Sequence, residues 1–120
     1  MSATKLKVIA PGATEGPLHE LAPQFTKSTG IDIDLSFSTA GGVKARFTGG
    51  EQADVIALST PMLQELEKEG RFVPGSRVEF GRASCGVAIR DGFLMPNIAT
   101  PEAFKKALLM ARSVAQTDPA

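Results

Sequence analysis

The fold is decided by residues 31–59, IDIDLSFSTAGGVKARFTGGEQADVIALS, which form a strand–helix–strand pattern. Apolar and polar residues alternate at the start, which predicts a half-buried strand over residues 30–37. A short helix is predicted over residues 43–47, ended by the Gly-Gly pair that follows. The near-continuous apolar run at residues 53–59 is typical of a strand that is covered on both faces in a parallel sheet.

The same alternation of strands and helices extends on both sides of this stretch. KLKVIA at residues 5–10 predicts a strand, and the breaker-rich PGATEG that follows predicts a turn. A helix is predicted from Glu15 to Gly30, because apolar residues recur at helical spacing. Ser59 or Thr60 is the expected cap of a further helix. The order β-α-β-α-β-α predicts an α/β protein with a parallel sheet and helices on its faces.

The second half of the chain has a different pattern. Two short strands are predicted at residues 78–82 and 85–90, followed by a helix capped by Thr100. SVAQT, residues 113–117, predicts a last strand. The simple alternation ends at GRFVPGSR, so we expect a first lobe at residues 1–77 and the hinge strands and start of a second lobe at residues 78–120.

Composition excludes several classes of protein. The chain has 120 residues, 42% hydrophobic, with 13 basic and 13 acidic side chains and no basic run. This balance argues against a nucleic-acid partner or an anionic membrane surface. A single cysteine, Cys85, excludes an internal disulfide and is expected in the core. Because no signal-peptide-like segment precedes the first strand, either the protein is cytoplasmic or an export signal is absent from this version of the chain.

The sequence contains few residues that point to catalysis or to metal binding. The single histidine, His19, has no second histidine as a partner and is expected to be solvated or capping. We find no nucleophile–base pair, no metal cluster at a recognisable spacing and no cofactor motif such as a Walker A loop or a Rossmann fingerprint. The sequence therefore predicts a binding protein that is not an enzyme.

Three strand-to-helix junctions are the candidate ligand site: PGATEG, STAGG and STP, at residues 11–16, 38–42 and 59–61. In a parallel sheet they lie at one edge, and each points free N–H groups and a helix dipole toward that edge. Together they suit a small anion or a polar ligand. STAGG alone is a weak signal and is more typical of a plain turn. Lys44, Arg46 and Arg82 are either solvated or able to reach an anion across a cleft.

Residues 5–59, GRASCGVAIRDG and TPEAFKKALLMARSVAQTDPA resemble molybdate-binding-type periplasmic substrate-binding proteins of ABC importers, in the same order. The resemblance implies a three-layer parallel-sheet lobe of the type II periplasmic-binding fold with the start of a second lobe. It also implies a tetrahedral oxyanion of the molybdate, tungstate or sulfate class, a membrane subunit as partner and a periplasmic location. No metal and no cofactor is implied. The ligand-binding residues it implies are Ala13, Thr14, Thr39, Ala40, Gly41 and Ser59.

The chain departs from this family pattern at two points. Ala13 stands where family members with tight oxyanion sites have a serine, and Glu15 adds a negative charge at the same helix start. The chain also corresponds to only part of a family member, which predicts exposed sheet edges and self-association, with segment exchange after residues 78–90. The alternative to a binding protein is therefore a self-associating α/β fragment without an intact ligand site.

Overall fold

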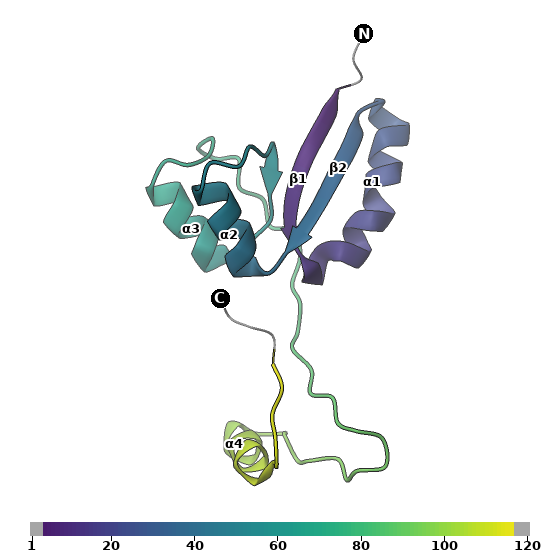
Figure 1. Ribbon diagram of the computed structural model, residues 1–120, viewed down its shortest axis with the longest axis vertical. Coiled ribbons are helices and arrows are strands. Elements are labelled where there is room, and N and C mark those ends of the chain that lie inside the picture. The colour runs from purple at the N-terminus through teal and green to yellow at the C-terminus, as the bar shows by residue number, and fades with distance from the viewer. Residues whose placement is uncertain (1–3, 117–120) are drawn as a thin grey trace. The chain divides into compact units, whose positions relative to one another are not determined.

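The computed structural model describes residues 4–116, which form two units, residues 4–81 and 82–116 (Figure 1). In chain order the first unit contains strand β1 (Lys5–Pro11), the short 3-10 helix η1 (Gly12–Thr14), helix α1 (Glu15–Thr29), strand β2 (Asp32–Ser38), helix α2 (Ala40–Thr48), strand β3 (Val55–Ile56) and helix α3 (Thr60–Lys68). The second unit contains helix α4 (Pro101–Met110). We describe each unit by itself.

The described strands form a parallel sheet with the order β2-β1-β3. The pairing of β1 with β2 runs from Lys5 opposite Asp32 to Pro11 opposite Ser38, and β3 pairs through Val55 opposite Val8. Crossover connections between parallel strands are right-handed. In the order β2-β1-β3 the connection from β1 to β2 and the connection from β2 to β3 run in opposite directions across the sheet, so their helices lie on opposite faces. Accordingly, α1 lies on one side of the sheet and α2 and α3 on the other (Figure 1). The predicted α/β fold with a parallel sheet is confirmed.

The core lies around the central strand β1. Its residues Val8, Ile9 and Ala10 are buried, together with Val43 of α2 and Leu66 of α3. The opposite helix is less well covered, because Leu21 and Phe25 on the apolar side of α1 are 47% and 40% exposed. The structure thus buries the α2 and α3 side of the sheet better than the α1 side.

Local helix signals in the sequence are confirmed. Gly30 ends α1 with a φ of 74°, a left-handed conformation that glycine adopts without strain. The Thr100 hydroxyl accepts a hydrogen bond from Ala103 N at 3.1 Å and so caps α4. Helix α2 begins at Ala40, earlier than the predicted residue 43, because Thr39 caps it.

Several predicted strands are wrong. Within the described residues no strand forms at 78–82, 85–90 or 113–116, while Thr117 lies outside the described part. β3 spans only two residues, and Val55 is 50% exposed instead of covered on both faces. Cys85 is exposed and does not belong to the core. A strand forms only where a neighbouring strand hydrogen-bonds to its N–H and C=O groups. An apolar run in the sequence does not show that such a neighbouring strand exists.

Candidate functional site

The carboxyl ends of the strands come together at one edge of the first unit. β1 is followed by η1 and α1, β2 by α2, and β3 by α3. Because the strands are parallel, all three helix starts lie at this edge, where open α/β sheets bind their ligands. The three junctions predicted from the sequence are therefore brought to the same edge.

The first junction contains Ala13 and Thr14. Both belong to η1, and the Thr14 hydroxyl donates a hydrogen bond to Pro11 O at 2.7 Å. Its proton is therefore used within the turn, and its oxygen is left as an acceptor. Glu15 begins α1, and its carboxylate lies 3.6 Å from His19 Nε2. A negative charge here stabilises the helix and opposes an anionic ligand.

The second junction is the start of α2. The Thr39 hydroxyl oxygen accepts a hydrogen bond from Gly42 N at 3.0 Å, which leaves its O–H available as a donor. Ala40 and Gly41 are the first residues of the helix, so their backbone N–H groups have no intrahelical acceptor. This junction offers donors from both a side chain and the backbone.

Gly42 has a different role from Gly41. A Cβ at Gly42 would overlap the Ser38 hydroxyl oxygen and would lie 3.1 Å from Thr39 Oγ1 and 3.3 Å from Ser38 Cβ. The absence of a side chain thus lets α2 approach the end of β2 closely. The glycine pair is visible in the sequence, but only the packing identifies the member that lacks room for a side chain.

The third junction is formed by Ser59 at the start of α3. Ser59 is the N-cap residue, and its carbonyl accepts a hydrogen bond from Leu63 N at 3.0 Å. Its exposed side chain makes no capping hydrogen bond. Of the three predicted hydroxyl residues, Ser59 is therefore the one whose side chain is not used to hold its own turn.

A charged cluster ties the other end of the sheet together. Arg46 donates to both carboxylate oxygens of Glu51, at 2.6 and 2.7 Å, and to the Ser36 hydroxyl at 2.9 Å. Lys7 Nζ reaches the same carboxylate at 2.9 Å. The hydrogen bonds from Arg46 and then Lys7 lower the pKa of Glu51 to about 2. The guanidinium group of Arg46 is therefore engaged in a structural ion pair with Glu51.

Lys44 is also engaged by a carboxylate. Its ammonium group lies 2.5 Å from Glu65 Oε2 and joins α2 to α3. The hydrogen bond raises the pKa of Lys44 and lowers the pKa of Glu65. Lys44 and Arg46, which the sequence left as candidates for an anion, thus both have carboxylate partners within the first unit.

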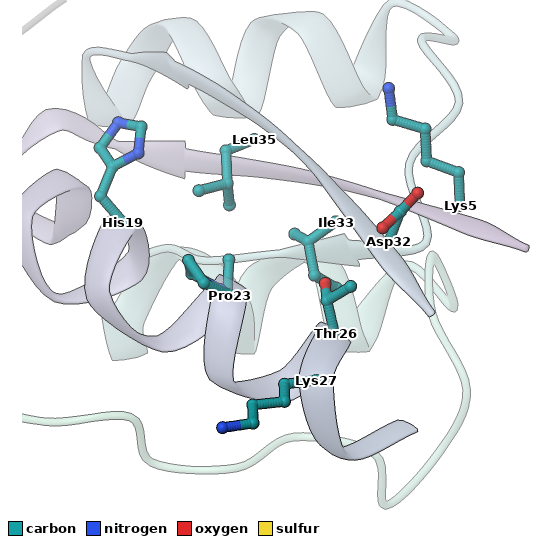
Figure 2. A pocket seen from close by; sticks show the side chains of 9 residues that line it. Lys5, His19, Pro23, Thr26, Lys27, Asp32, Ile33 and Leu35 are labelled. Carbon is teal, nitrogen blue, oxygen red and sulfur yellow. The ribbon is translucent and has the colours of Figure 1, made fainter. Parts of the chain in front are cut away.

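A groove of about 700 Å³ lies between α1 and β2, and Lys5 of β1 lines one end of it (Figure 2). It extends to the beginning of the strands, away from the three junctions, as the positions of Lys5 and Asp32 indicate. We place the candidate site at the junctions because hydroxyl and N–H donors lie together there. The groove is lined instead by charged and apolar side chains, of which Lys5 is paired with Asp34 and His19 with Glu15. The residues that line it are Lys5, His19, Ala22, Pro23, Thr26, Lys27, Asp32, Ile33 and Leu35.

Within residues 4–116 no group of three or more histidine, cysteine, aspartate or glutamate side chains is placed to hold a metal ion. In the same part of the chain, every helix is too short or too polar to cross a membrane. The second and third junctions offer hydroxyl and N–H donors, whereas at the first the Thr14 hydroxyl is left as an acceptor and Glu15 adds a carboxylate. Such donors bind oxygen-rich ligands by hydrogen bonds.

Comparison with known proteins assigns the class. The model of the family of bacterial extracellular solute-binding proteins matches residues 6–120. The chain belongs to this family. Together with a molybdate-binding relative and a solved structure of the same fold, this match confirms the resemblance to molybdate-binding-like periplasmic proteins.

The individual relatives have names that state different functions, an isomerase in one case and molybdate-binding proteins in the others. An aconitate isomerase from a Pseudomonas species is 33% identical over 98% of this chain and 47% of its own length. The molybdate-binding protein ModA of Azotobacter vinelandii is 32% identical over 65% of this chain and 31% of its own. A solved structure of the periplasmic molybdate-binding protein of that organism matches 59% of this chain and 31% of its own, with a TM-score of 0.57 and 32% identity. The chain thus spans half or less of the relatives it matches.

Proposed function

We propose that this chain supplies part of the ligand site of a solute-binding protein and binds a small anion at the three junctions. The ligand-binding residues in this proposal are Ala13, Thr14, Thr39, Ala40, Gly41 and Ser59. The observation that carries it is the start of α2, where the Thr39 hydroxyl and the N–H groups of Ala40 and Gly41 are free to donate. Membership of the family supports delivery of the ligand to an ABC importer and a periplasmic location.

The ligand class follows from charge and from the relatives. The names of two relatives support different anions, molybdate in one case and the tricarboxylate aconitate in the other. Glu15 follows Thr14 directly and opposes a compact dianion at the helix start, whereas an organic anion can place its charged groups apart. Among small anions we therefore propose that carboxylates bind in preference to molybdate, tungstate or sulfate.

A thermal melt with each anion tests this proposal. The panel contains molybdate, tungstate, sulfate, citrate and aconitate. An anion present at about a hundred times its Kd stabilises the folded state by about 2.7 kcal/mol. Ser59→Ala should weaken the shift without lowering the ligand-free midpoint, because the side chain makes no cap.

The matched control is Ser28→Ala in the last turn of α1, where the hydroxyl donates to Phe25 O. This variant should keep the full ligand-induced shift. Equal shifts for Ser59→Ala and the unchanged chain would remove Ser59 from the site. No shift with any anion in the panel would contradict the proposal as a whole.

An isomerase is the second candidate function, because the relative that covers 98% of this chain bears that name. Isomerisation by proton transfer needs a base at the ligand. Glu15 and His19 are the titratable groups beside the first junction. Exchange of aconitate protons for deuterium, followed by NMR, distinguishes this candidate from a binding protein, in which no exchange is expected.

Self-association is the remaining alternative, and the exposed apolar side of α1 supports it. Leu21 and Phe25 are about half exposed there, and Val55 is exposed on β3. We propose that a second copy covers this side, by simple packing or by segment exchange. Light scattering at increasing concentration should show a dimer that Phe25→Lys weakens. A monomer at every concentration would contradict this alternative.

A further inference from the structure

The start of α1 contains an ion pair and a ring contact that share one residue. His19 Nε2 lies 3.6 Å from Glu15 Oε1, one helical turn away. The His19 ring also lies against Phe37 near the end of β2, with ring centroids 5.4 Å apart and planes inclined by 46°. His19 therefore connects the helix start of the first junction to the strand that leads into the second.

We propose that the Glu15–His19 pair is a pH-sensitive positioning element of the anion site, in which protonated His19 strengthens anion binding. This inference rests on the proposed function. Protonation turns the 3.6 Å contact into an ion pair that draws the Glu15 carboxylate along the helix, away from Thr14 and the junction. It also neutralises the charge that opposes an anion at the helix start.

Phe37 favours the same protonated state. An aromatic ring within about 6 Å attracts a cation through its negative face. The contact therefore retains His19 beside β2 when the imidazole carries a charge. Loss of the proton weakens both contacts at once, because the neutral ring attracts neither the carboxylate nor the aromatic face in this way.

The charged groups around His19 lie on α1, β1 and β2. Glu15 is the charged partner of His19 on α1, and Phe37 is its ring contact on β2. The charged residues Lys5, Lys27 and Asp32 line the rest of the groove, with Lys5 and Asp32 at the end away from His19 (Figure 2). Histidine is the side chain that ordinarily changes charge between about pH 5 and 8, and this chain contains a single one.

Isothermal titration with sulfate and citrate at about pH 5.5 and about pH 8 tests the proposal. Sulfate remains doubly charged over this range, so a change in its affinity reports on the protein. We expect affinity to be about two- to fivefold higher at the lower pH, the effect of one charge at a helix terminus. Glu15→Gln should bind with the higher affinity at both pH values, and His19→Gln with the lower.

Amide NMR without ligand separates this inference from the proposed function. The amides of Thr14 and Glu15 should shift as His19 titrates, and His19→Gln should abolish that response. Retained pH dependence of affinity in His19→Gln, or no amide response in the unchanged chain, would overturn the positioning role. A normal amide response without binding of any anion would show that His19 is coupled to the helix start, and would overturn the proposed function and with it the effect on anion affinity.

Discussion

Replacing Gly42 by alanine should destabilise the chain, although alanine is the better helix former. Gly42 lies in the first turn of α2, and a Cβ there would overlap Ser38 Oγ. Rotation of the Ser38 side chain relieves this overlap. The 3.3 Å approach to Ser38 Cβ persists unless the helix itself shifts, and the 3.1 Å approach to Thr39 Oγ1 is relieved only by a rotation that breaks the hydrogen bond from Gly42 N.

The expected magnitude is the difference between two opposing effects. Alanine gains about 0.8–1 kcal/mol over glycine in a helix interior. Overpacking a close contact costs about 1–3 kcal/mol. Gly42→Ala should therefore lower the free energy of unfolding by up to about 2 kcal/mol, and shift α2 relative to the end of β2.

The control for Gly42→Ala is Gly16→Ala in the first turn of α1, where an added Cβ meets nothing within 4 Å. This variant should gain stability, up to about 1 kcal/mol. Urea unfolding followed by circular dichroism measures both. Ser38→Ala removes the overlapping oxygen and should restore part of the loss in the double variant. The reasoning is refuted if Gly42→Ala stabilises the chain as much as Gly16→Ala does.

Two further predictions concern the charged cluster and the core. Because the pKa of Glu51 is lowered from 4.5 to about 2 in the folded state, its ion pairs stabilise the chain above pH 4.5, and this contribution disappears as the pH falls toward 2. Glu51→Gln should flatten that part of the urea midpoint–pH profile, whereas Glu20→Gln, at an exposed position of α1, should leave it in place. Leu66→Ala should cost about 2–5 kcal/mol in urea unfolding, because the side chain is fully buried, and Val55→Ala, at a half-exposed position, should cost clearly less.

Signals carried by neighbouring residues were sufficient to predict most of the first unit. The run KLKVIA predicted β1, and alternation predicted β2. Gly30 predicted the end of α1, and the cap residues Ser59 or Thr60 and Thr100 predicted the starts of α3 and α4. The failures occurred where a partner far along the chain decides the outcome. Residues 78–90 have strand-like composition, but a strand forms only where another strand pairs with it.

The candidate site was predictable only in part, for the same physical reason. The hydroxyl residues and their helix starts follow from the local order of residues. The partners of the charged residues do not, since Lys7 and Glu51 are 44 positions apart and meet only because β1 and the loop before β3 are adjacent. Likewise, the sequence does not show that Thr14 uses its proton within its own turn.

In the proposed site, the two glycines that follow β2 have different roles, because Gly42 allows close packing and Gly41 leaves a backbone N–H accessible. Gly42 admits the helix to within contact of Ser38, and its N–H donates to Thr39 Oγ1. That hydrogen bond turns the Thr39 oxygen inward as an acceptor and leaves its proton to donate. Gly41 stands before it in the first turn, so its N–H has no intrahelical acceptor and no Cβ shields it. In the proposed site, the close packing of α2 on β2 is therefore what orients the donors of this junction.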